Sequence, residues 1–161
     1  MSEVPNRFPP AVLFRSFFLV AGAYMLNVFL VGVVGFGLML TAFPDSAEIF
    51  DLAPEEFNKV FSENPEKVYP PELLWIMLGV SIVVCFGLGY FVARMAPLAK
   101  FPHSVLFAAI LFVQYLQLAI GATDSLQRML VLFMAASPIA AILGANWFLR
   151  SFVLKNDSQL D

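Results

Sequence analysis

Long apolar runs separated by short polar segments form the dominant pattern along this chain. The clearest run extends from Leu73 to Val92, twenty residues without a charge, and it is bounded by Glu72 and Arg94. A helix rises about 1.5 Å per residue, so this run measures about 30 Å, the thickness of the hydrocarbon core of a bilayer. We therefore predict a membrane-spanning helix over residues 73–94.

Three more apolar runs predict three more spanning helices, at residues 17–43, 104–122 and 129–149. The first of these runs is interrupted only by Asn27 and Thr41. It is far longer than the apolar core of about 7–15 residues in a cleavable signal peptide, so we interpret it as a span. A tight turn containing Gly121, Thr123 and Asp124 is expected between the last two helices.

The only long polar segment, residues 44–71, separates the first two spans. Within it, Pro54 followed by two glutamates is typical of a helix start, because acids are favoured at the positive end of the helix dipole. Phe57, Val60 and Phe61 then fall on one helical face. We predict a short amphipathic helix that lies on the membrane surface or covers the end of the bundle.

The basic residues predict how the chain is oriented. Four spans place both termini on the same side, together with six basic residues: Arg7, Arg15, Arg94, Lys100, Arg150 and Lys155. The opposite side holds Lys59, Lys67 and Arg128. Because basic residues concentrate on the cytoplasmic side, we expect cytoplasmic termini and an extracytoplasmic acidic loop at residues 44–71.

The composition agrees with this interpretation. Hydrophobic residues make up 60% of the 161 residues and charged residues 13%, against about 45–50% and about 25% in soluble domains. The expected fold is therefore all-α: a single integral membrane domain over residues 1–161, a bundle of four transmembrane helices with one short extracytoplasmic amphipathic helix. The lipid bilayer is then its first partner.

Few residues indicate chemistry. Between the arginines at the helix ends, no Asp, Glu, Lys, Arg or His lies inside a predicted span, which argues against a proton pump or an ion-coupled transporter. The chain has no phosphate loop, nucleophile elbow or metal-ligand repeat. We therefore expect no catalytic residue, no metal, no cofactor and no nucleic-acid partner, and we do not expect an enzyme.

Small residues recur every four positions in two of the predicted spans, which places them on one face of each helix. These residues are expected to pack against neighbouring helices, and they are Ser81, Cys85, Gly89 and Ala93 in the second span and Ala136, Ala140 and Gly144 in the fourth. The glycines of the first span, Gly22, Gly32, Gly35 and Gly37, are likewise expected to allow close approach.

Five polar residues within the spans fall near one depth, namely Asn27, Ser81, Gln114, Gln117 and Ser137. One interpretation is hydrogen bonding between helices, which contributes about 0.6 kcal/mol per contact in membranes. The other is a small binding pocket at the midplane, as in carriers. We favour the first; Tyr115, beside Gln114, is placed to join this layer.

His103 follows Pro102 at the expected cytoplasmic interface. A neutral imidazole there is able to ligate a metal or a tetrapyrrole, but a solvated or headgroup-facing side chain at a helix start is the more common arrangement, and we favour it.

The segment from Gly87 to Pro97, followed by His103, resembles a pattern found in small bacterial inner-membrane proteins with four predicted spans. In that pattern a helix ends in a glycine, an aromatic residue and an arginine between small residues, and a histidine opens the next helix. The resemblance implies a multi-pass protein of the bacterial inner membrane. It implies no activity, since these proteins are uncharacterised.

Three functions remain open at this point. The first is a structural or accessory subunit that packs with itself as a homo-oligomer or with a larger membrane complex, as the small-residue faces suggest. The second is a small carrier of a neutral solute or a lipid that uses the midplane polar layer. The third is a pigment-binding subunit or a membrane enzyme that uses His103.

Overall fold

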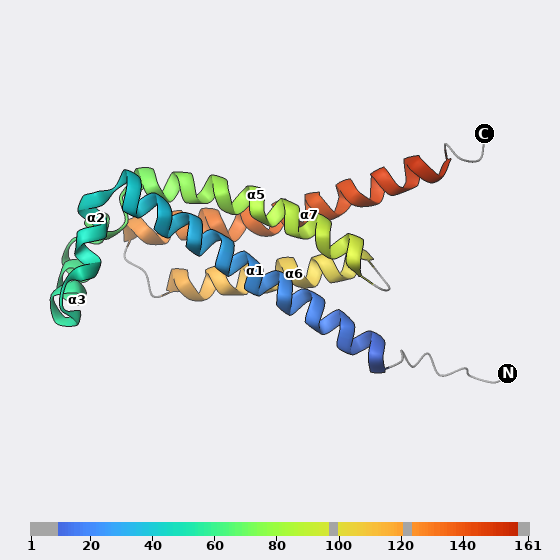
Figure 1. Ribbon diagram of the computed structural model, residues 1–161, viewed down its shortest axis with the longest axis horizontal. Coiled ribbons are helices and arrows are strands. Elements are labelled where there is room, and N and C mark those ends of the chain that lie inside the picture. Colours follow the sequence, from blue (N-terminus) through green and yellow to red (C-terminus); the bar gives the residue numbers. More distant parts are fainter. Residues whose placement is uncertain (1–9, 97–99, 121–123, 158–161) are drawn as a thin grey trace.

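The computed structural model describes residues 10–96, 100–120 and 124–157, and within these ranges the chain is helical with no strand (Figure 1). Four helices are long and apolar enough to cross a membrane, and they are α1 (Pro10–Ala42), α5 (Pro71–Met95), α6 (Lys100–Ile120) and α7 (Asp124–Asp157). The prediction of an all-helical chain with four long apolar helices is thus confirmed. This arrangement suggests a multi-pass membrane protein.

All four long helices begin before the predicted spans, because apolar composition indicates which part of a helix suits lipid and not where the helix itself starts. α1 begins at Pro10, and α6 begins at Lys100, so that Pro102 lies in its first turn. A proline fits there because the first N–H groups of a helix lack an intrahelical acceptor. α7 continues to Asp157. Residues 121–123 of the predicted turn lie outside the described residues.

The acidic segment between α1 and α5 folds into four short helical pieces: α2 (Pro44–Glu48), the 3-10 helix η1 (Ile49–Asp51), α3 (Pro54–Glu63) and α4 (Pro65–Val68). α3 begins at the expected Pro54, whereas the other three pieces were not predicted. Phe57, Val60 and Phe61 are half-buried in α3, and the rest of that helix is exposed. Contact of α3 with a membrane surface stays a prediction.

These short pieces form one cap at an end of the bundle. The hydroxyl of Ser46 donates a hydrogen bond to the carbonyl oxygen of Lys67 at 2.8 Å, which joins α2 to α4. The ring of Phe57 lies 5.3 Å from that of Phe50 and 6.1 Å from that of Phe61. The first residues of α1 and the last residues of α7 lie at the opposite end of the bundle (Figure 1).

The small-residue rows of α5 and α7 face one another inside the chain. A Cβ atom added to Gly89 would collide with the backbone carbonyl of Ala141, and one added to Gly144 would collide with that of Phe86. The two helices therefore touch backbone to backbone. The remaining predicted packing residues are buried or half-buried in the same bundle, namely Ser81, Cys85, Ala93, Ala136 and Ala140.

α1 packs differently from α5 and α7. A Cβ atom added to Gly22, Gly32 or Gly37 would meet nothing within 4 Å, so no other helix of the same chain makes the expected close approach at these three glycines. At Gly35 an added Cβ would meet only the side chain of Met77. The glycines of α1 therefore leave space beside the helix instead of drawing a neighbour's backbone against it.

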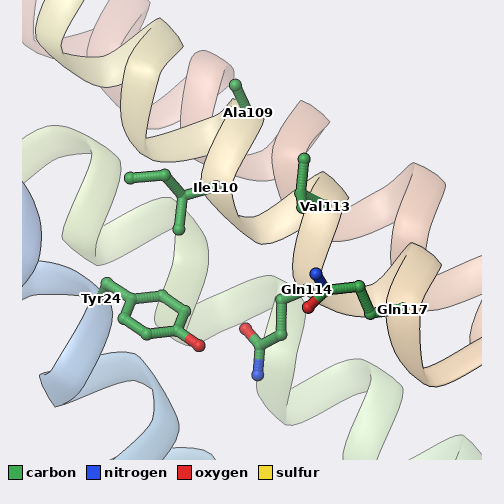
Figure 2. Close-up of a pocket in the computed structure, with 6 residues that line it drawn as sticks. All are labelled: Tyr24, Ala109, Ile110, Val113, Gln114 and Gln117. Atoms are coloured by element: carbon green, nitrogen blue, oxygen red, sulfur yellow. The ribbon is translucent and has the colours of Figure 1, made fainter.

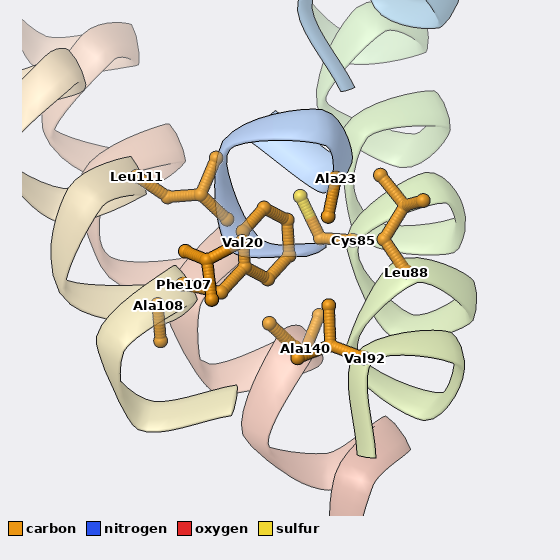
Figure 3. Close-up of a cluster of buried hydrophobic side chains, with 10 residues drawn as sticks. Val20, Ala23, Cys85, Leu88, Val92, Phe107, Ala108, Leu111 and Ala140 are labelled. Carbon is orange, nitrogen blue, oxygen red and sulfur yellow. The ribbon is translucent and has the colours of Figure 1, made fainter. Parts of the chain in front are cut away.

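The core contains mostly small and medium side chains from all four long helices (Figure 3). Phe107 is its largest fully buried member and packs with residues such as Val20, Val92 and Ala140. Large apolar side chains lie on the outside instead, with Phe17 67%, Val83 72% and Ile120 75% exposed. Small residues inside and large apolar residues outside suit a bundle surrounded by lipid, because lipid does not drive large apolar groups inward.

Candidate functional site

Five side chains from all four long helices meet inside the bundle and form what we call the polar cluster: Asn27, Ser81, Cys85, Tyr115 and Ser137. Ser81 occupies its middle. The hydroxyl oxygen of Ser81 lies 2.9 Å from that of Ser137 and 3.1 Å from that of Tyr115. These two contacts connect α5 to α7 and to α6.

Cys85 extends the polar cluster to α1. It follows Ser81 by one helical turn, and its thiol donates a hydrogen bond to Asn27 Oδ1 at 3.3 Å. Cys85, Ser81 and Asn27 are at most 1% exposed. Because buried polar groups that lose a partner are costly, each of these hydrogen bonds favours one register between two helices.

The polar cluster contains three of the five residues predicted for the midplane layer: Asn27, Ser81 and Ser137. Cys85 was expected to act only as a small packing residue, yet it donates a hydrogen bond. Its spacing of four from Ser81 was the signal available in the sequence. Gln114 and Gln117 do not join this network, since Tyr115 is the residue of α6 that faces Ser81.

A cavity of about 420 Å³, which we call the large cavity, lies between the polar cluster and the cap. Its walls come from all four long helices, and Phe50 and Tyr69 line it from the cap. Asn27 and Tyr115 of the polar cluster also line it. Its lining residues are Asn27, Val28, Val31, Gly32, Gly35, Phe36, Met39, Phe50, Tyr69, Leu73, Leu74, Met77, Gln114, Tyr115, Leu118, Leu130 and Phe133.

The lining of the large cavity is mainly apolar and carries no Asp, Glu, Lys, Arg or His among the residues that the structure describes. Several of its members are also exposed on the outer surface: Val28 by 42% and Phe36 by 57% on α1, and Leu118 by 51% on α6. The large cavity is therefore partly open at the outer face of the bundle. In a bilayer that face meets lipid.

A second space of about 380 Å³, which we call the α1–α6 groove, is lined by Tyr24 from α1 and by Ala109, Ile110, Val113, Gln114 and Gln117 from α6. Figure 2 shows the hydroxyl of Tyr24 and the amide of Gln114 directed toward one another across it. Gln114 also lines the large cavity, so its side chain lies where the two spaces meet. Its Oε1 atom is buried without a hydrogen-bond partner.

The Asp, Glu, Lys, Arg and His side chains of the described residues lie toward the two ends of the bundle. The ammonium of Lys100 lies 5.0 Å from the ring centroid of Phe148 and 4.4 Å from that of Phe152, which fixes the start of α6 against α7. Burial raises the pKa of Tyr69 above its ordinary value of 10.0. His103 is half-buried in the first turns of α6. No three His, Cys, Asp or Glu side chains of the described residues are grouped as metal ligands.

No family model matches the chain, and no curated protein or solved structure matches it either. The fold and the polar cluster define its class only broadly, as an all-helical chain with four apolar helices that suggest a multi-pass membrane protein. Its function has to be argued from its own residues.

Proposed function

We propose that this protein lies in a membrane and binds a lipid-like ligand, whose apolar chain occupies the large cavity. The observation that carries this proposal is the cavity itself, about 420 Å³ of mainly apolar space that is partly open at the outer face of the bundle. Its volume falls within the range of about 300–1,000 Å³ that is usual for small-molecule sites.

The proposed orientation places both termini in the cytoplasm and the cap outside. Its support is the excess of basic residues predicted for the cytoplasmic side, and the position of the cap at the end of the bundle away from the start of α1 and the end of α7 (Figure 1). Location in a bacterial inner membrane rests on the resemblance of residues 87–103 alone.

The chemistry of the lining favours a neutral ligand segment. A charged group in the large cavity would lose its hydration without gaining an opposite charge, because no charged side chain of the described residues lines the wall. An alkyl or isoprenoid chain has no such penalty. Phe50 and Tyr69 line the cavity at the end next to the cap and add two aromatic rings to its wall.

A purely structural role has less support than it had from sequence. The small-residue rows that suggested a homo-oligomer or a larger complex pack against each other within one chain, at Gly89 and Gly144. They are therefore not available to another subunit. The carrier hypothesis uses features that the internal packing leaves open.

Gly32→Leu tests the proposal directly. Gly32 lines the large cavity, and a Cβ atom there meets nothing within 4 Å, so a leucine side chain can start into open space and add bulk at the cavity wall. Gly37→Leu is the matched control, because Gly37 lies on the same helix with equally open surroundings and does not line the cavity. Both substitutions improve helix propensity similarly.

The assay is photo-crosslinking of the full chain in nanodiscs with a sixteen-carbon alcohol that carries a diazirine on its chain. We expect saturable adducts on the cavity lining of the wild type and of Gly37→Leu, and at least a tenfold decrease in Gly32→Leu. Adducts confined to outward residues such as Val83 and Ile120, unchanged by Gly32→Leu, would reject the cavity as a ligand site and leave the structural role.

A further inference from the structure

The junction between the large cavity and the α1–α6 groove contains an acceptor that the fold does not use. Gln114 Oε1 is buried with no hydrogen-bond partner, whereas each of the five side chains of the polar cluster makes a hydrogen bond. An unpaired buried carbonyl oxygen is costly, and in lipid there is no bulk water to pair it. This side chain lies on the wall of both spaces, so a hydrogen bond from a ligand to it would contribute more binding free energy than one made elsewhere on the wall.

The surroundings of Gln114 restrict the kind of polar group that fits. Tyr24 and Gln117 line the same groove, so the polar groups near Gln114 are a phenol and an amide, both uncharged. Figure 2 shows that the Tyr24 hydroxyl and the Gln114 amide point into the shared space from opposite helices. The described lining of the groove offers no ammonium or guanidinium to an anion and no carboxylate to a cation.

We propose that the ligand of the large cavity carries a small, uncharged hydrogen-bond donor, such as the hydroxyl of a long-chain alcohol, and that Gln114 Oε1 accepts its hydrogen bond. This inference rests on the proposed function, since it places the ligand's chain in the large cavity and its donor at the junction with the α1–α6 groove. It excludes a phospholipid as the ligand held at Gln114, because a zwitterionic or anionic headgroup would be buried there without a counter-charge.

Three competitors with the same sixteen-carbon chain separate the alternatives in the photo-crosslinking assay. 1-Hexadecanol has a donor, hexadecyl methyl ether has an acceptor only, and dipalmitoyl phosphatidylcholine offers the chain with a charged headgroup outside. We expect the alcohol to compete about fivefold better than the ether, as one net hydrogen bond implies, and the phospholipid to compete least.

Gln114→Leu removes the acceptor and keeps an apolar side chain of similar size. We expect it to reduce the preference for the alcohol over the ether to about one while both still compete at the cavity. Gln117→Leu is the matched control on the same helix, because Gln117 is exposed and lines only the α1–α6 groove; it should keep the preference.

The outcomes separate this inference from the proposed function. If alcohol and ether compete equally in the wild type and saturable adducts still form in the cavity, the proposed hydrogen bond to Gln114 is refuted, and the lipid-binding function stays in place. Phosphatidylcholine that competes as well as the alcohol refutes that hydrogen bond too, and identifies a bilayer lipid chain as the occupant. Absence of any saturable adduct rejects the proposed function itself. The wild-type comparison holds even if Gln114→Leu fails to fold.

Discussion

Replacing Gly89 by alanine tests the packing on which the bundle depends. A Cβ atom at this position would collide with the carbonyl oxygen of Ala141, and it would lie 2.6 Å from the carbonyl carbon and 2.7 Å from Cα of the same residue. Since Cβ contacts below 3.0 Å are essentially not observed, α5 and α7 must separate to accept the methyl group. The carbonyl oxygen of Gly89 also accepts a hydrogen bond from Ser104 at 3.4 Å, which the shift would disturb.

The size of the effect follows from two opposing terms. Overpacking against a rigid backbone costs about 3 kcal/mol, the upper end of the usual range. Alanine improves helix propensity over glycine by about 1 kcal/mol. The net expectation for Gly89→Ala is a loss of about 2 kcal/mol in the free energy of unfolding. Gly87, two residues earlier, is surrounded by open space, so Gly87→Ala should stabilise by up to about 1 kcal/mol.

The assay is unfolding of purified protein by sodium dodecyl sulfate in mild-detergent micelles, followed by circular dichroism at several protein concentrations. The two alanine variants should shift the midpoint in opposite directions, independently of concentration. A Gly89→Ala variant as stable as Gly87→Ala would refute the backbone contact between α5 and α7. A shift that grows on dilution would instead place Gly89 between subunits.

Two further predictions concern the polar cluster and the cap. Ser81→Ala removes the shared hydrogen-bond partner of Tyr115 and Ser137 and should lower the free energy of unfolding by about 1 kcal/mol. The control is Ser62→Ala, at an exposed serine whose hydroxyl bonds only within its own helix, and it should change the free energy of unfolding little. Equal effects of the two substitutions would show that the polar cluster adds no stability. Burial raises the pKa of Tyr69 above 10.0, so the folded state holds the phenol proton more tightly than the unfolded chain does. The contribution of Tyr69 to stability is therefore complete below pH 10.0 and is lost as the pH rises through the pKa of the folded state. Unfolding measured across that range should show this loss in the wild type and not in Tyr69→Phe, and identical curves would contradict the burial of the phenol.

The polar side chains show how far sequence reasoning reaches into the candidate site. Counting residues along each helix placed Asn27, Ser81 and Ser137 at one depth, and they do meet. Counting did not decide between Gln114 and Tyr115, which are adjacent in sequence but about 100° apart around the helix. Tyr115 bonds to Ser81, and Gln114 lines the groove on another side. Rotation of a helix about its axis depends on its neighbours, so a single apolar helix does not encode it locally.

The sequence by itself determined that four long apolar helices form, because length and hydropathy act locally along the chain. It also determined which faces of α5 and α7 allow close packing, since small residues at four-residue spacing share a face whatever the neighbour. Only the tertiary structure decided that these faces pack on each other and that the glycines of α1 leave space. The walls of the large cavity come from all four long helices and from the cap, so its existence depends on how these elements pack together and not on any one segment.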